Sequence, residues 1–215
     1  MFLKCKYQEF VLPKVHVTPQ HKGKKKKSVG LLGGGFNPVH HGHLVIADQV
    51  SEQLHLDEFY LMPSFHSPHI DEKKVIDASH RVAMLDLAIE DNPTLKLELC
   101  EIDRQGKSYT YDTIKQLTEE NPEVSYYFII GGDMVDYLPK WYRIDELVSM
   151  VQFVGVNRSG YNIESNYPII WVDVPLLDIS SSMIRKKINQ NGSIRYFTPD
   201  KVLDYIEKEG LYRND

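Results

Sequence analysis

The chain has 215 residues, a formal net charge of −5 and two cysteines. This length suits one α/β domain with a sizeable buried core, and the acidic balance gives no general reason to expect nucleic acid as a partner. No run approaches the roughly 18 apolar residues of a membrane span, and the N-terminus lacks the apolar core of a signal peptide. Cys5 and Cys100 lie far apart, which suits reduced thiols better than a disulfide framework. We therefore predict a cytoplasmic protein, without a membrane or nucleic-acid partner.

Residues 1–27 differ from the rest of the chain. They carry Lys4, Lys6, Lys14 and Lys22, followed by the run Lys24 to Lys27. A like-charge run of this kind normally stays solvated, although the nearby valines would allow part of the segment to add an edge strand. We predict a basic N-terminal extension over 1–27 and a single folded domain over 28–215.

From residue 29 onward, short apolar runs alternate with helical patterns. Strands are predicted over 29–32, 58–62, 95–99, 125–130, 152–156 and 169–172, and helices over 43–55, 80–90, 111–119, 143–149 and 180–189. A last helix has Thr198 as its predicted N-cap, Pro199 at its first position and Gly210 past its end. Alternation of this kind predicts a Rossmann-like, doubly wound, mostly parallel sheet with a small helical C-terminal end. In such sheets, ligands bind beyond the carboxyl ends of the strands.

The first strand runs into a glycine-rich turn and two histidines. Gly33, Gly34, Gly35 and Phe36 follow the strand, and Asn37-Pro38 makes a stiff turn. His40 and His43 then stand three residues apart where a helix begins, so their rings can share one face. A helix N-terminus adds free N–H groups and a positive dipole end. The pattern indicates a polyphosphate site.

Other interpretations of this turn are weaker. A glycine-rich turn after a first strand is often merely structural. A zinc site needs three or four converging ligands, usually including Cys or a carboxylate, and no cysteine lies nearby, so no metal site is predicted. A dinucleotide fingerprint fails because Pro38 replaces its third glycine, and a P-loop ending at Ser108 fails because Glu101 replaces its first glycine.

A second signature lies near the C-terminus. Ile179, Ser180, Ser181, Ser182 and, one turn later, Arg185 form a loop that enters a helix. Serines at such a place are common N-caps. Together with an arginine they also form a phosphate cradle of hydroxyls, backbone N–H groups and a guanidinium.

These two signatures resemble those of the nucleotidylyltransferase superfamily, and the fuller match is to bacterial nicotinate-nucleotide adenylyltransferases. The shared segments are the turn from Gly33 to His43, His80–Leu85, Ser108–Thr113, Gly131–Tyr142 and the final helix. Where the family has a proline-proline-histidine-lysine stretch, this chain has Ser67-Pro68-His69-Ile70, so the lysine is missing.

The resemblance implies which residues bind each substrate. ATP would be bound by Gly33, Gly34, Gly35, Phe36, His40, His43, Ile179, Ser180, Ser181 and Arg185, with His40, His43 and Arg185 catalytic and Mg²⁺ arriving with the ATP. Nicotinate mononucleotide would be bound by Asn37, His69, Thr110, Gly132, Asp133, Trp141 and Tyr142, with Trp141 stacking on the ring. Read without the family, Trp141 packs under its loop as readily, and Asp133 serves as readily as a helix cap.

The expected reaction is adenylyl transfer from ATP to nicotinate mononucleotide, giving deamido-NAD and pyrophosphate. Nicotinamide mononucleotide or phosphopantetheine as acceptor, and a non-catalytic nucleotide-binding regulator, are the alternatives. The sequence leaves homo-oligomerisation open. His80 and Arg81 are assigned to a core-facing helix and not to the site.

Overall fold

The computed structural model describes residues 26–67, 75–157, 165–175 and 177–213. Six strands form one sheet in the order β3-β2-β1-β4-β5-β6, and every neighbouring pair is parallel. The predicted sheet is therefore confirmed, and all of its pairings are parallel. Predictions that concern residues 1–25 and His69 lie outside the described residues.

The elements follow the predicted order with small shifts at their ends. The strands are β1 (Lys27–Gly34), β2 (Glu58–Pro63), β3 (Leu95–Leu97), β4 (Val124–Gly131), β5 (Gln152–Asn157) and β6 (Ile169–Asp173). The longer helices are α1 (His41–Gln53), α2 (Ala78–Ile89), α4 (Thr110–Glu120), α6 (Ile144–Met150), α7 (Ser181–Asn189) and α8 (Asp200–Glu209). Three short elements were not predicted, namely α3 (Cys100–Arg104), α5 (Gly132–Val135) and the 3₁₀ helix η2 (Leu138–Lys140).

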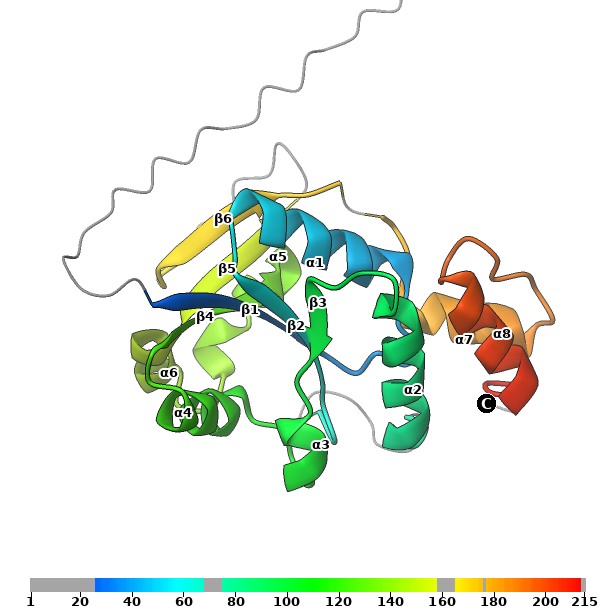
Figure 1. Cartoon of the computed structure of the whole chain (residues 1–215), viewed down its shortest axis with the longest axis horizontal. Coiled ribbons are helices and arrows are strands. Elements are labelled where there is room, and N and C mark those ends of the chain that lie inside the picture. Colours follow the sequence, from blue (N-terminus) through cyan, green and yellow to red (C-terminus); the bar gives the residue numbers. More distant parts are fainter. Residues whose placement is uncertain (1–25, 68–74, 158–164, 176, 214–215) are drawn as a thin grey trace, which may run out of the picture.

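Each face of the sheet is covered by its own core. Leu32, Ile129 and Val154 point to the face where buried residues of α1, α2, α7 and α8 pack. Leu31, Phe128 and Phe153, their neighbours in the strands, point to the face covered by α4 and α6. This alternation is the period-two geometry of strands that are buried on both sides. Figure 1 shows α1 on one side of the sheet and α4 and α6 on the other.

The order of the strands places the topological switch point between β1 and β4, at the middle of the sheet. The chain moves outward from β1 to β2 and β3, then returns to β4 on the other side of β1. Connections that leave β1 and β4 therefore turn in opposite directions, and a ligand can enter beyond the carboxyl ends of these two strands. Gly34 ends β1 and Gly131 ends β4 at this place.

The C-terminal helices α7 and α8 lie beside the sheet, next to α2, as the predicted helical end (Figure 1). The predicted cap of α8 was wrong by one residue. The N-cap is Pro199, and the hydroxyl of Thr198 instead donates to the carbonyl oxygen of Val39 at 3.0 Å, where both residues are buried. Gly210 follows the helix with φ 64°, a left-handed conformation that favours glycine.

Within the described residues, no helix has the length and apolar character needed to cross a membrane. Cys100 is buried as a free thiol.

Candidate active site

The two histidines of the first turn form a stacked pair. His40 is the last residue before α1, and His43 lies in its first turn. Their ring centroids are 3.7 Å apart, with an angle of 24° between the planes. The Nδ1 atom of His43 accepts a hydrogen bond from the backbone N–H of His40 at 3.2 Å. The helix start thus holds both rings together, as their spacing in the sequence predicted.

Both imidazoles are neutral at physiological pH. Burial, and then the proximity of His41, lower the pKa of His40 to about 4. Burial, and then the proximity of His40, lower the pKa of His43 well below its usual value. Because Nδ1 of His43 accepts a hydrogen bond, its single ring proton is assigned to Nε2. His43 is therefore a neutral donor in a residue that is partly exposed as a whole, whereas His40 is buried.

Gly42, between the histidines, makes this stacking possible. A Cβ atom at this position would lie 3.0 Å from Nδ1 and 3.1 Å from Cε1 of His40. It would also lie 3.8 Å from the carbonyl oxygen of Ile179 in the late loop. The glycine leaves room for the His40 ring and for the approach of the second signature.

The glycines that end the first strand leave room for two aromatic rings. A Cβ at Gly33 would lie 3.2 Å from the ring of Phe128, and one at Gly34 would lie 3.3 Å from the ring of Phe36. Phe36 is buried, and its ring meets that of His43 edge-on at 4.9 Å. These two glycines were predicted to let the backbone approach a ligand, and the structure gives them a packing role at the same place.

The second signature, at the start of α7, contacts the turn that follows β1. Ser181 donates its hydroxyl hydrogen to the carbonyl oxygen of Pro38 at 2.8 Å. The Nη1 atom of Arg185 donates to the carbonyl oxygen of Asn37 at 2.7 Å, and Nη2 donates to the hydroxyl of Ser182 at 3.2 Å. Ser180 caps α7, because its hydroxyl accepts from the N–H of Met183. The two signatures predicted to share one site therefore lie in direct contact.

Residues near the C-terminus also form hydrogen bonds with the same turn. The hydroxyl of Tyr212 donates to the side-chain oxygen of Asn37 at 2.9 Å, and the N–H of His41 donates to the carbonyl oxygen of Phe197 at 3.0 Å. Asn37 is buried. Its side chain thus takes part in the support of the turn, a role that no sequence pattern indicates.

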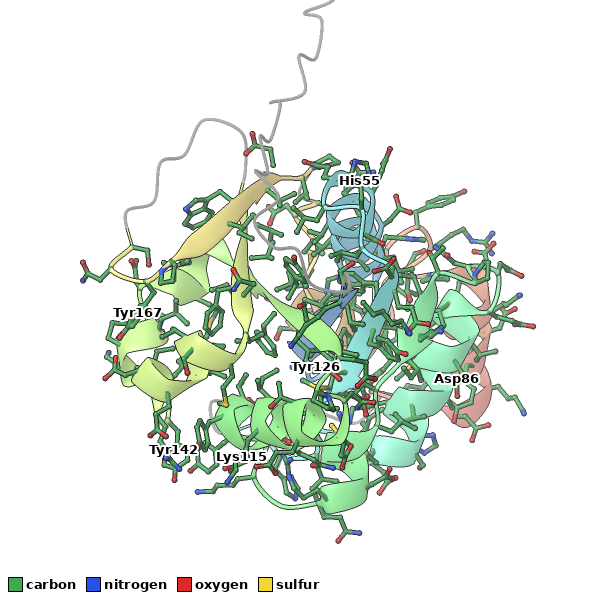
Figure 2. The ribbon with its side chains drawn as sticks, turned by 60° about the vertical axis from the view of Figure 1, so that its left-hand side comes forward. His55, Asp86, Lys115, Tyr126, Tyr142 and Tyr167 are labelled. Carbon is green, nitrogen blue, oxygen red and sulfur yellow. The ribbon has the colours of Figure 1, made fainter. Side chains whose placement is uncertain are left out.

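The residues predicted for the acceptor lie past β4 and at the start of α4. Gly132 and Asp133 begin α5 directly after β4, and Thr110 is the first residue of α4. Tyr142 lies at the outer edge of the molecule (Figure 2), where its ring contacts those of Tyr109 and Tyr111 at 5.1 and 5.8 Å. Its side chain is half exposed.

Trp141 packs under its loop and is also partly exposed. Its ring meets Phe128 and Phe153 edge-on at 6.0 and 5.9 Å. Its indole N–H is buried without a hydrogen-bond partner in the part of the chain that the structure describes. Since the Phe128 ring also fills the space at Gly33, one aromatic ring connects the first turn to Trp141.

Sequence reasoning missed two buried polar residues beneath the site. Arg81 is 1% exposed and donates to four backbone carbonyls in two connections, the one after β1 and the one between β2 and α2. Glu101 is 4% exposed, and it accepts from the hydroxyl of Thr113 at 2.7 Å. Burial raises the pKa of Glu101, and hydrogen bonds from Thr113 and Ser108 oppose this rise. A helical pattern gives no signal for either contact, because their partners are distant in the sequence.

Comparison with known proteins agrees with this geometry. A family model described as cytidylyltransferase-like matches residues 31–187. The probable nicotinate-nucleotide adenylyltransferase of Streptococcus pneumoniae serotype 4 is 60% identical over 199 residues, which cover 93% of this chain and 95% of the relative. The corresponding Enterococcus faecalis protein is 60% identical over 190 residues, covering 88% of this chain and 87% of the relative.

A solved structure supports the fold. The Plasmodium falciparum nicotinic acid mononucleotide adenylyltransferase, in complex with NaAD, superposes with a TM-score of 0.73 at 22% identity, covering 88% of this chain and 98% of that one. The family is shown by the matched family model and the two bacterial relatives. The chain belongs to the nicotinate-nucleotide adenylyltransferases, within the cytidylyltransferase-like family.

Proposed function

We propose that this chain transfers the adenylyl group of ATP to the phosphate of nicotinate mononucleotide. A phosphate oxygen of the mononucleotide forms a bond to the α-phosphorus, the bond between the α-phosphorus and the bridging oxygen breaks, and pyrophosphate leaves. The product is deamido-NAD. The observation that carries the proposal is the contact of Ser181 and Arg185 with the turn that bears His40 and His43, in a chain 60% identical to relatives with this activity in their names.

The reaction needs no nucleophile from the protein. The phosphate of the mononucleotide is already ionised at neutral pH, so catalysis consists of alignment and stabilisation of charge. This agrees with a site made of hydrogen-bond donors at a helix N-terminus.

His40 and His43 are proposed to hold the α-phosphate. A neutral His43 donates through Nε2–H to an oxygen that gains negative charge as the α-phosphorus is attacked. The free N–H groups at the start of α1 reinforce this donor. Because the low pKa values keep both rings neutral, this donor capacity does not change near pH 7.

Ser181 and Arg185 are proposed to hold the β- and γ-phosphates. The planar guanidinium suits two oxygens of one phosphate, and Arg185 is partly exposed beside the turn. Gly35, Ile179 and Ser180 complete the ATP side. The substrate is MgATP, because Mg²⁺ is held well by phosphate oxygens and water.

The acceptor is proposed to bind across the ends of β4 and α4. An exposed face of Trp141 would stack on the nicotinate ring, with Thr110 and Tyr142 near its carboxylate. Gly132 and Asp133 are proposed to meet the ribose, and Asn37 and His69 to face the phosphate side. The proposed partners are thus two small molecules. The use of ATP and the free thiol of Cys100 both fit a cytoplasmic location.

Pyrophosphate release across a panel of acceptors tests this function. The panel contains nicotinate mononucleotide, nicotinamide mononucleotide and phosphopantetheine, each with MgATP, and a control without acceptor. We expect the highest kcat/KM with nicotinate mononucleotide and the formation of deamido-NAD. A higher value with another acceptor would contradict the proposed substrate. ATP binding without pyrophosphate release for every acceptor would instead identify a regulator.

A further inference from the structure

Arg81 is a charged side chain placed inside the protein, directly beneath the candidate site. It lies in the first turns of α2, and its side chain is among the largest that the fold buries fully. A buried guanidinium is costly unless its N–H groups are hydrogen-bonded. The hydrogen-bond partners of the Arg81 side chain therefore indicate its role.

All four hydrogen bonds of the Arg81 side chain within the described residues go to backbone carbonyl oxygens. Nη1 donates to Gly35 at 3.0 Å and to Ser64 at 2.7 Å. Nη2 donates to Phe65 at 3.4 Å, and Nε donates to Ile76 at 3.3 Å. The carbonyl oxygens accept hydrogen bonds from the Arg81 guanidinium but carry no negative charge that would neutralise it. Arg81 therefore joins segments of backbone and does not form an ion pair within the described residues.

These four carbonyls belong to two connections that meet the substrates. Gly35 lies in the turn that follows β1, on the proposed ATP side. Ser64 and Phe65 directly follow β2, and Ile76 precedes α2, so they stand at the two ends of one connection. The segment 64–66 also contacts Ser108, two residues before Thr110, which the proposed function places near the acceptor. We name this segment the acceptor connection, and one guanidinium joins it to the ATP turn.

Ser108 holds the same backbone independently of Arg81. The N–H of Phe65 donates to the hydroxyl of Ser108 at 3.0 Å, and the N–H of Ser108 donates to the carbonyl oxygen of His66 at 2.9 Å. Ser108 leads directly into Thr110 at the start of α4, which is also on the acceptor side. The segment 64–66 is thus fixed between Arg81 and Ser108.

The ATP turn has other supports that do not depend on Arg81. Ser181 and Arg185 bind the carbonyls of Pro38 and Asn37, and β1 pairs with β2 up to Gly34. The N–H of Ser64 also donates to the carbonyl oxygen of Gly34 at 2.9 Å. Loss of Arg81 therefore releases the acceptor connection more than the ATP turn.

We propose that Arg81 is a positioning residue, which sets the acceptor connection at the correct distance from the ATP turn without touching either substrate. This inference rests on the proposed function. In-line transfer requires the acceptor phosphate to approach the α-phosphorus closely, and a misplacement of about 1 Å can lower the rate on the order of 100-fold. The role thus predicts a particular kinetic pattern.

Steady-state kinetics with both substrates varied test the proposal in Arg81→Met and Arg81→Lys. For Arg81→Met we expect kcat to fall by about 10- to 100-fold and the KM for nicotinate mononucleotide to rise by about 10-fold. The KM for ATP should change by less than about 3-fold, because its turn keeps its other supports. Arg81→Lys should fall between Arg81→Met and wild type, since one ammonium cannot reach all four carbonyls.

Two further variants separate positioning from stability. Ile89→Ala removes buried side chain from the far end of α2, so it should lower the melting temperature and leave the kinetic constants as in wild type. Ser108→Ala removes the hydroxyl that accepts from the N–H of Phe65, so it should loosen the segment 64–66 and raise the KM for the acceptor even if Arg81→Met fails to fold.

Wild-type kinetic constants in folded Arg81→Met, or in Ser108→Ala, would overturn the proposal, and so would an equal rise of both KM values. A wild-type enzyme that releases no pyrophosphate with nicotinate mononucleotide would instead overturn the proposed function.

Discussion

The Nη1 atom of Arg185 lies 2.7 Å from the carbonyl oxygen of Asn37, although 148 positions separate the two residues in the sequence. The neighbouring bond from Ser181 to Pro38 spans 143 positions. The C-terminal part of the chain therefore completes the turn that the first strand begins. The donors proposed for the α-phosphate and those proposed for the β- and γ-phosphates belong to one connected unit.

Gly42→Ala tests the stacked histidines. The new Cβ would lie 3.0 Å from Nδ1 of His40, closer than an ordinary contact, so the ring must shift. We expect kcat to fall about 10-fold, because donors in such sites act only when well placed. Steady-state kinetics together with a melting curve measure this effect.

Gly192→Ala is the matched control for Gly42→Ala. Its Cβ would lie 3.2 Å from the carbonyl oxygen of Lys187, beyond the end of α7 and away from the turn. It should cost some stability and leave kcat unchanged. Equal kcat values in the two variants would show that the fit at Gly42 has no special role.

The stability of the fold should depend on pH through His40. Its pKa is about 4 in the folded protein and ordinarily 6.5, so the folded state binds fewer protons than the unfolded state between these values. The contribution of the neutral His40 to the free energy of unfolding is therefore fully present above pH 6.5. It is lost as the pH falls toward 4, and the loss amounts to up to about 3 kcal/mol. The lowered pKa of His43 acts in the same direction.

Urea denaturation at several pH values between 7.5 and 4.5 measures this dependence. His40→Gln removes one of the titrating rings, so its free energy of unfolding should fall less steeply with pH than that of wild type. Identical slopes would mean that His40 is not the neutral, buried ring described above.

Trp141 should report the binding of nicotinate mononucleotide. The protein has two tryptophans, so Trp171→Phe leaves Trp141 as the single emitter. Stacking on the nicotinate ring should quench its fluorescence in a saturable way, whereas MgATP alone should have little effect. Trp141→Leu should raise the KM for the mononucleotide by roughly 10-fold or less. An active Trp171→Phe enzyme whose fluorescence ignores the mononucleotide would rule out the stacking.

The sequence predicted those parts of the fold that rest on local patterns. The longer helices and every strand except the three-residue β3 have enough residues for their apolar pattern to be visible, as β4 and α4 illustrate. The short α3, α5 and η2 do not, since a single turn has no periodicity. The capping role expected of Thr198 failed because its hydroxyl has a tertiary partner, the carbonyl of Val39.

In the candidate site, too, the features with a local sequence pattern were predicted and the tertiary contacts were not. The spacing of His40 and His43 predicted their shared face, and the serines before α7 predicted a cap, which Ser180 provides. The contacts of Arg81 join backbone at residues 35, 64, 65 and 76. A side chain on the buried face of a helix gives no local sign of such partners, so only the folded structure reveals them.

A double-mutant cycle on His43 and Arg185 tests most directly whether both ends of the chain act on one triphosphate. The measurement is kcat for adenylyl transfer to nicotinate mononucleotide in wild type, His43→Ala, Arg185→Met and the double variant, each verified as folded. We predict that His43→Ala alone lowers kcat on the order of 100-fold or more, and that the double variant loses less than the product of the single losses. Wild-type kcat in folded His43→Ala, or losses that simply multiply, would contradict the shared site.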